Sequence, residues 1–168
     1  MNVIIIAAVA ENNAIGKDND LIWSLPADMA FFKEKTRGTT VLTGRKNYES
    51  IPEKYRPLPG RENIVITRKK DYSAPGSKVV HSIEEAIEYC KGKDELYVIG
   101  GGEIYKLALE KDVVDIMYIT EIHGSFDADA FFPEFDKSKW HEEILGEHGI
   151  DEKHAYSFTF KIFRRRKN

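Results

Sequence analysis

A single carboxylate, Asp28, lies within the largely apolar segment LIWSLPADMAFFKE at residues 21–34. Burying a lone charge costs several kcal/mol unless another group compensates it. In the first turn of a helix, an aspartate commonly does no more than satisfy free backbone amides. Phe31 and Phe32 follow one helical turn later, so the face that carries Asp28 also carries aromatic rings. A carboxylate in that setting could instead bind a flat, cationic or amidine-like ring through two parallel hydrogen bonds.

Three consecutive glycines follow an apolar segment in VIGGGEIY at residues 98–105. A strand that passes through glycines into a helix presents free amides and the positive end of the helix dipole to an anion. The segment does not match the GxGxxG pattern, because Tyr105 occupies the position of the third glycine. A tight strand-to-helix turn would explain the glycines equally well. The glycines alone therefore leave phosphate binding and a ligand-free turn open.

Basic residues stand at the ends of two further predicted strands. Arg45 and Lys46 follow the strand at 40–44, and the TRKK segment at 67–70 lies at the end of the strand at 63–68. Each cluster taken by itself is typical of a solvated surface. Ligands of parallel sheets bind at the carboxyl ends of the strands. Together with the glycines, the two clusters could therefore hold a ligand with several phosphates.

Several other kinds of site are not indicated by the sequence. The five histidines show no ligand spacing such as HxxxH, and the single cysteine, Cys90, excludes an internal disulfide and a multi-cysteine metal site. The net charge of −3 provides no basic field for nucleic acid or an anionic membrane. The apolar run at 3–10 is too short to span a bilayer, and no cationic stretch precedes it. We therefore expect a cytoplasmic protein without a metal, nucleic-acid or membrane partner. The lack of an obvious exposed apolar stripe is compatible with a monomer.

The elements that must position these residues alternate between strands and helices. Pro26 suits the first position of a helix, and Ser82 with Glu85 forms a capping-box pattern. Strands are predicted at 2–10, 40–44, 63–68, 78–82, 96–100 and 114–122, helices at 26–36, 45–51, 82–90 and 101–111, and a closing hairpin at 140–148 and 155–165. This alternation predicts an α/β fold with a mainly parallel sheet in a single domain spanning residues 1–168.

Five segments, in this order, resemble the dihydrofolate reductase family: AIGKDNDLIWSLPADMAFFK, TGRKNYESI, RPLPGRENIVITR, VIGGGEIY and DADAFFPEF. They extend over nearly the whole chain. The resemblance implies an eight-stranded, mostly parallel twisted sheet with an antiparallel C-terminal hairpin and four flanking helices. It also implies NADPH-dependent reduction of 7,8-dihydrofolate to 5,6,7,8-tetrahydrofolate, in which hydride transfer accompanies protonation of the pterin imine nitrogen.

The resemblance assigns the substrate site residue by residue. Asp28 would be the catalytic residue, hydrogen-bonding the amino group and the adjacent ring nitrogen of the pterin. Thr120 would hydrogen-bond Asp28 or reach the pterin through water, and Arg61 would pair with the α-carboxylate of the glutamate tail. The apolar residues implied around the rings of the substrate are Ile6, Ala8, Phe32, Ile51 and Leu58.

The resemblance likewise assigns the NADPH site. Arg45 and Arg68 would bind the 2′-phosphate, and Lys46 and Asn47 would hold the pyrophosphate. The Gly100–Gly101 peptide would be strained, cis or trans, and would permit close approach. The remaining residues implied for the cofactor are Ala8, Ile15, Gly16, Leu21, Thr67, Ile99, Gly100, Gly101, Gly102, Glu103, Ile104 and Tyr105.

The loop from 14 to 21 would close over the nicotinamide, with Asp129 bracing it. The sequence departs from the family pattern at Ile22, where proline is usual, and at Asn47, which replaces a frequent threonine. Ala128 and Ala130 flank Asp129 where glycine and threonine are common. These changes are expected to affect the bracing of the loop more than the chemistry.

Parts of the sequence are also compatible with two other functions. A reductase of similar fold could act on a pyrimidine of the riboflavin pathway, but Asp28 beside Phe32, together with Arg61, favours a pteroyl-glutamate. A non-catalytic nucleotide-binding module would keep the glycines and the basic clusters, but it would have no need of a buried Asp28.

Overall fold

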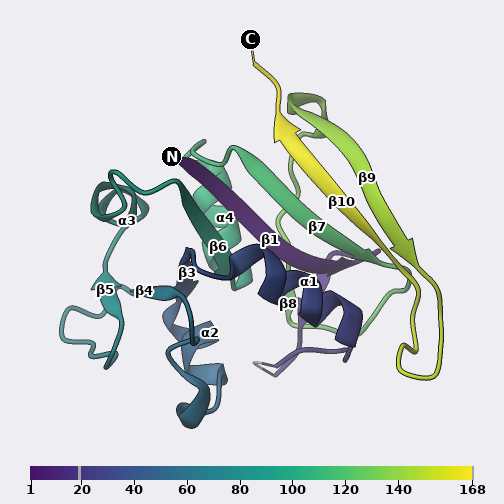
Figure 1. Cartoon of the computed structure of the whole chain (residues 1–168), viewed down its shortest axis with the longest axis horizontal. Helices are drawn as coiled ribbons and strands as arrows, with labels where there is room; N and C mark the ends of the chain where they lie inside the picture. Colours follow the sequence, from purple (N-terminus) through teal and green to yellow (C-terminus); the bar gives the residue numbers. More distant parts are fainter. Residues whose placement is uncertain (19, 168) are drawn as a thin grey trace.

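A twisted eight-stranded sheet forms the centre of the protein (Figure 1). The computed structural model describes residues 1–18 and 20–167. In spatial order the strands are β5 (Lys78–Val80), β4 (Glu62–Ile66), β3 (Thr40–Gly44), β6 (Glu95–Gly100), β1 (Asn2–Ala10), β7 (Ile116–Ile122), β10 (Phe158–Arg165) and β9 (Trp140–His148). The strands from β5 to β7 are parallel, and β10 is antiparallel to both β7 and β9. The mostly parallel sheet with a C-terminal hairpin is thus confirmed.

Four α-helices accompany the sheet in the described part of the chain: α1 (Pro26–Thr36), α2 (Arg45–Ser50), α3 (Ile83–Tyr89) and α4 (Gly102–Glu110). Two short 3-10 turns lie at Glu53–Tyr55 and Lys137–Lys139. Pro26 begins α1 as predicted, and the Ser82 side chain caps α3 by accepting the Glu85 amide at 3.0 Å. No described helix has the length and apolar character needed to cross a membrane.

The central strand β1 is buried on both faces, as its continuous apolar sequence predicts. Val3 and Ile5 point into the core that α3 and α4 cover, whereas Ile4 and Ile6 pack with Phe31 of α1 on the opposite face. Figure 1 shows α1 and α4 on opposite sides of the sheet in this way. The alternation gives the strand two cores at once, which fixes its register because a shift by one residue would exchange them.

The carboxyl ends of the parallel strands meet at one edge of the sheet. Thr43 of β3 pairs with Gly100 of β6, and Ala8 of β1 pairs with Thr120 of β7. The glycine segment and the basic residues after β3 and β4 therefore start from the same edge. This is the edge at which ligands of such sheets bind.

A second, two-stranded antiparallel sheet joins β2 (Ala14–Gly16) to β8 (Ala130–Phe131). The sequence reasoning did not predict it. Both strands are too short to show a hydrophobic period, and they are far apart in the chain. The pair ties the loop after β1 to the segment that precedes the C-terminal hairpin.

Strand β9 forms one outer edge of the large sheet. Ile144 and Leu145 are 57% and 45% exposed there, and glutamates at 142, 143 and 147 are also exposed. On the inner neighbour, Lys161 lies 3.3 Å from the carboxylate of Glu142 and 2.8 Å from that of Glu121.

Candidate active site

The first turn of α1 brings Asp28 next to β7. The hydroxyl of Thr120 donates a hydrogen bond to Asp28 Oδ1 at 2.7 Å, and Asp28 Oδ2 accepts none from the residues that the structure describes. Burial raises the pKa of Asp28, and the Thr120 hydrogen bond opposes that rise by favouring the ionised form. One carboxylate oxygen is thus fixed while the other is open to a ligand. The site can accept two parallel hydrogen bonds from a planar group.

Apolar side chains adjoin this carboxylate on the same face of the sheet. Ile6 is buried, and Phe32, Leu58 and Ile99 pack against the same cluster as partly buried residues. The structure thus brings these four predicted residues together. Ile51 is partly buried but does not belong to that cluster.

Arg61, in the loop before β4, contacts the last residue of α1 and is held by neutral groups. Its Nε donates to Thr36 Oγ1 at 2.8 Å, and its guanidinium lies 5.7 Å from the centroid of the Phe32 ring. It forms no ion pair with a carboxylate of the described residues. Burial lowers the pKa of Arg61, and the nearby charge of Arg37 lowers it further. Two cations close together without a described counter-ion favour an anionic ligand group.

The glycine segment joins β6 to α4 without any capping side chain. The Gly100–Gly101 peptide is cis, one of the two states that the resemblance left open, and Gly100 has a φ of 120° that a side chain would strain. A Cβ at Gly101 would meet nothing within 4 Å, so the backbone there is open to close approach. The start of α4 therefore offers uncapped amides and the positive helix end to an anion.

Tyr105, one turn into α4, lies beside the glycine segment. Its hydroxyl donates to the backbone oxygen of Ile6 at 2.9 Å and lies 3.2 Å from where a Cβ of Gly100 would be. Burial raises the pKa of Tyr105, and the charge of Asp28 raises it further. Tyr105 is therefore a neutral phenol that connects the carboxylate side of the site to the glycine side.

The basic residues lie around the glycine segment, but two of them are paired with carboxylates. Arg45 donates to Glu49 at 2.8 Å, and Arg68 pairs with Glu103 of α4. Lys46 is exposed. Both arginines would have to exchange a carboxylate for a phosphate when an anionic ligand binds.

Several other predicted cofactor residues lie near the ends of β1, β3 and β4 or on α4. Asn47 donates to Thr43 Oγ1 at 2.9 Å and lies beside Gly100, and Thr67 is buried with its hydroxyl accepting the Lys69 amide at 3.1 Å. Ala8 is partly buried at the end of β1. A Cβ at position 44 would meet Ile104 at 2.7 Å, so β3 and α4 are in close contact. Open amides, glycines and two arginines fit a dinucleotide with a further phosphate.

The segment expected to close over the site is tied to β8. Asp129 Oδ2 accepts the Asp18 amide at 2.9 Å, and the Asp129 amide donates to the Gly16 oxygen at 3.1 Å. Ile15 lies 3.4 Å from where a Cβ of Gly102 would be, whereas Leu21 is 60% exposed. Residue 19, which belongs to this segment, lies outside the described residues. Asp129 therefore ties this segment to the residues just before β8, and the closure of the segment over the nicotinamide stays a prediction.

Sequence reasoning missed two contacts of this segment. Lys17 forms an ion pair with Asp127, and the backbone oxygen of Phe131 lies directly against Gly102. The opposite charges could have suggested the first contact, but no residue type marks the second, because its partner is a backbone atom.

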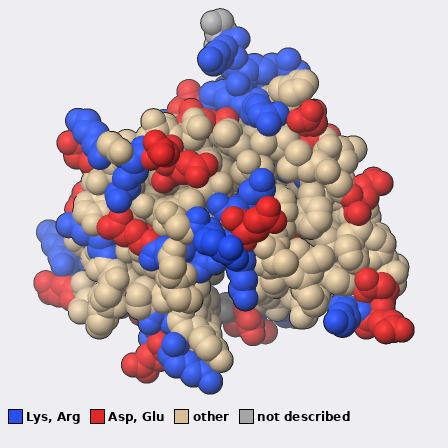
Figure 2. Space-filling model, in the orientation of Figure 1, with Lys and Arg blue, Asp and Glu red and all other residues tan. Residues whose placement is uncertain are grey.

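Figure 2 shows the surface hollowed between the part that α2 forms and the part that α1 forms, with Lys and Arg side chains gathered beside the hollow. Of the two elements beside it, α1 carries Asp28, and α2 carries the residues that follow β3. The arrangement can bind an elongated anionic ligand at its rim and a flat ring inside.

Three comparisons with known proteins agree. The family model described as dihydrofolate reductase matches residues 2–165. The chain is 42% identical over 162 residues to the dihydrofolate reductase of Bacillus subtilis, covering 96% of this chain and 93% of that protein. It is 45% identical over 160 residues to that of Neisseria gonorrhoeae, covering 95% and 96%. A solved dihydrofolate reductase from Enterococcus faecalis, complexed with NADP(H), superposes with a TM-score of 0.89 at 38% identity, covering 99% of this chain and 97% of that one.

Proposed function

Since the chain belongs to the dihydrofolate reductase family, whose members reduce 7,8-dihydrofolate to 5,6,7,8-tetrahydrofolate with NADPH, we propose that Asp28 binds the pterin ring and stabilises its protonated form. The observation that carries this role is the contact with Thr120. It fixes Asp28 Oδ1 at 2.7 Å and leaves the second oxygen open beside an apolar wall.

The proposed mechanism follows from charge. When bound, NADPH would supply hydride to the carbon of the pterin carbon–nitrogen double bond. The nitrogen of that bond takes up a proton, and water delivers it. The Asp28 carboxylate accepts hydrogen bonds from the amino group and the adjacent ring nitrogen, and it stabilises the positive charge that develops on the ring. Burial strengthens this interaction because few waters compete with it.

The remaining residues of the substrate site bind the substrate and orient it. Arg61 binds the α-carboxylate of the glutamate tail, supported by its lack of a described counter-ion and by the neighbouring charge of Arg37. Ile6, Phe32 and Leu58 enclose the rings, and Ile51 adds to this wall from the rim.

The cofactor is held by the other half of the site. Arg45 and Arg68 release their carboxylate partners to bind the 2′-phosphate, which favours NADPH over NADH. Lys46 and Asn47 hold the pyrophosphate from one side, and the uncapped start of α4 holds it from the other. The other residues proposed to contact the cofactor are Ala8, Ile15, Gly16, Leu21, Thr67, Ile99, Gly100, Gly101, Gly102, Glu103, Ile104 and Tyr105.

The direct test mixes purified protein with NADPH and dihydrofolate and follows the near-ultraviolet absorbance of the reduced cofactor. Asp28→Asn should keep NADPH binding and lose most of the turnover. In single turnovers of the wild type, the hydride step should slow as pH rises, because the protonated substrate becomes scarcer. Normal turnover of Asp28→Asn would remove the proposed role, and rates that stay flat from acid to alkaline pH would contradict the mechanism.

We also propose that the enzyme works as a monomer in the cytoplasm. A single continuous sheet with both faces of its central strand covered supports the monomer. Light scattering coupled to size-exclusion chromatography should give the mass of one chain. A concentration-independent dimer would contradict this proposal.

A further inference from the structure

A histidine from the far end of the chain completes the start of α1. His154, in the connection between β9 and β10, is only 5% exposed, and its Nε2 lies 3.0 Å from the backbone nitrogen of Ala27. The residue that would normally cap this helix, Leu25, offers no side-chain hydrogen bond. The first turn of α1 therefore obtains its acceptor from a residue 127 positions away. The residue after Ala27 is Asp28.

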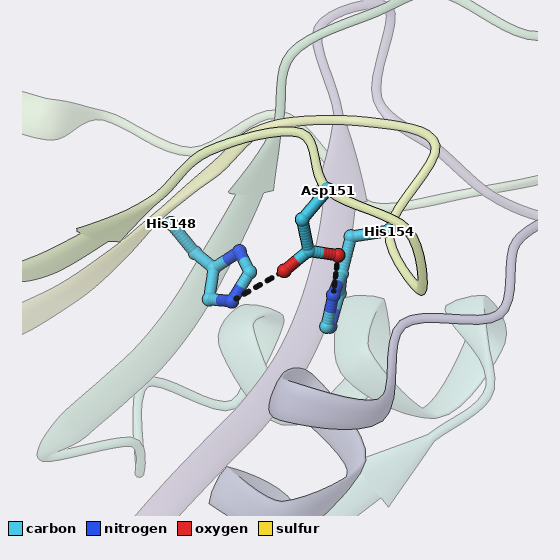
Figure 3. Close-up of side chains that lie close together, drawn as sticks. All are labelled: His148, Asp151 and His154. Carbon is cyan, nitrogen blue, oxygen red and sulfur yellow. Dashed lines mark hydrogen bonds and ion pairs between the residues drawn. The ribbon is translucent and has the colours of Figure 1, made fainter.

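The hydrogen bonds fix the proton of the imidazole. A backbone amide can only donate, so His154 Nε2 must be the acceptor. Nδ1 then carries the proton and donates to Asp151 Oδ1 at 2.8 Å (Figure 3). His148 lies on the other side of the same carboxylate, with its Nε2 3.7 Å from Asp151 Oδ2. These contacts define a neutral His154 with a single tautomer.

The same three side chains invite comparison with a metal site. The potential ligand atoms of His148, Asp151 and His154 lie within 4.8 Å of one another, although the sequence spacing had not suggested a metal. Two imidazoles and a carboxylate suit zinc. A metal-bound histidine donates its other N–H to an acceptor. For His148 this holds, because its Nδ1 lies 2.7 Å from the Gly149 oxygen.

For His154 the requirement of a metal ligand is not met. If Nδ1 bound a metal, the proton would move to Nε2 and point at the Ala27 amide, so that two donors would face each other at 3.0 Å. The first turn of α1 would then have to move away from His154. The observed geometry therefore favours a helix cap over a metal ligand.

We propose that His154 is a positioning residue for substrate binding: it holds the first turn of α1 and thereby sets where Asp28 stands relative to Thr120. The imidazole ring of His154 is itself held in place by its neighbours. His148 stacks on the fully buried Phe158 with an interplanar angle of 2°, and His154 lies 5.6 Å from the same ring. Asp151 orients the ring from its outer side. The inference rests on the role proposed above for Asp28.

The proposal predicts that loss of the cap affects the binding of dihydrofolate and of NADPH differently. Ala27 and Asp28 belong to α1, on the substrate side, whereas the residues proposed to bind the phosphates of the cofactor lie on α2, on α4 and after β4. Loss of the cap should therefore weaken dihydrofolate binding and leave NADPH binding unchanged. A merely structural histidine would weaken both ligands or neither.

Two variants separate the cap from the rest of the side chain. In His154→Gln the side-chain oxygen can reach the position of Nε2 and accept the Ala27 amide. In His154→Asn the shorter side chain reaches only the position of Nδ1, so it can contact Asp151 but not Ala27. We expect His154→Asn to raise the dissociation constant of dihydrofolate by about tenfold, as loss of a helix cap implies. His154→Gln should stay within about threefold of the wild type, and NADPH affinity should stay within about twofold in both.

Equal dihydrofolate affinity in the two variants, or a matched loss of NADPH affinity, would overturn the proposal. Nitrogen NMR of the unmodified protein provides a test that needs no variant. It should show an unprotonated His154 Nε2 coupled through the hydrogen bond to the Ala27 amide, and a protonated Nε2 would overturn the proposal. Asp28→Asn, measured in parallel, separates the two assignments: normal dihydrofolate binding there would remove the role of Asp28, while the NMR result still decides the cap.

Added zinc tests the competing assignment. We expect zinc ions to leave the Nε2 signal and the dihydrofolate affinity of the wild type unchanged. Binding of one zinc ion per chain that weakens in both His148→Gln and His154→Gln would identify a metal site and overturn the cap.

Discussion

A methyl group added at Gly101 or at Gly102 should separate the function of the glycine segment from its packing. A Cβ at Gly102 would lie 2.6 Å from the backbone oxygen of Phe131, whereas a Cβ at Gly101 would meet nothing within 4 Å. Real contacts of this kind essentially never fall below 3.0 Å, so Gly102→Ala must move α4 and β8 apart by at least 0.4 Å. The opposing atom belongs to the backbone, so it cannot turn aside as a side chain would.

The expected magnitudes differ accordingly. Overpacking of this kind costs about 1–3 kcal/mol, which corresponds to a fall of roughly 2–12 °C in the Tm of a domain of this size. Gly101→Ala has room in the protein and a φ of −82° that any residue adopts. Its Tm should therefore match that of the wild type. The added methyl would instead occupy the space proposed for the phosphates and weaken NADPH binding by about tenfold or more.

Thermal unfolding of the ligand-free protein and calorimetric titration with NADPH measure the two effects separately. A wild-type Tm for Gly102→Ala would refute the close contact between α4 and β8. Wild-type NADPH affinity for Gly101→Ala would refute the placement of the phosphates at the start of α4. If Gly101→Ala lost as much stability as Gly102→Ala, its weaker binding could not be assigned to the phosphates.

Three further changes concern the substrate side. Thr120→Val keeps the shape of the side chain but removes the donor to Asp28 Oδ1. Single-turnover hydride transfer should therefore slow about tenfold or more, because hydrogen bonds to charged groups contribute about 1.5–3 kcal/mol. An unchanged rate would show that the carboxylate does not need this donor. Arg61→Gln should raise KM for dihydrofolate about tenfold and leave kcat nearly unchanged. As a control, the substitution should not change steady-state rates with an analogue that lacks the glutamate tail. A fall in kcat alone would contradict this role. Because burial raises the pKa of Asp28 in the folded protein, ionisation of Asp28 lowers the free energy of unfolding as pH rises from the unfolded pKa of about 3.9 through the folded pKa. In urea unfolding without ligand, Asp28→Asn should therefore be more stable than the wild type at neutral pH, and this gain should shrink toward acid pH; a gain that is independent of pH would exclude the charge as its cause.

The parallel part of the sheet could be predicted because its strands are buried on both faces. The apolar run of β1, residues 3–10, has no other stable place than the middle of a covered sheet. Pro26 and Ser82 mark the starts of two helices through local chemistry alone. The pairing of β2 with β8 could not be predicted in this way. Strands of three and two residues carry no measurable period, and only tertiary contacts bring them together.

The candidate site was partly visible in the sequence for a related reason. Residues that follow parallel strands must meet at one edge, so the glycines and the basic clusters could be placed together without knowledge of their contacts. Thr120 was found only through the family resemblance, because a threonine inside a strand is ordinary in itself. His154 left no signal at all, since its partner is the backbone amide of Ala27. The spacing of the histidines also hid how the loop after β9 brings His148 and His154 around Asp151.

The exposed edge at β9 has a consequence for how concentrated solutions of this protein behave. An unpaired strand with Ile144 and Leu145 on its surface could recruit the same strand of another molecule. Three exposed glutamates, at 142, 143 and 147, lie along this edge, and the first two pair with Lys161 and Arg164 of β10. A second strand laid against the edge would bury some of these charges, and charged side chains on an edge strand disfavour such pairing. These side chains therefore act as a guard against edge-to-edge aggregation. Their replacement by neutral residues would leave the chemistry intact while making the enzyme prone to precipitate.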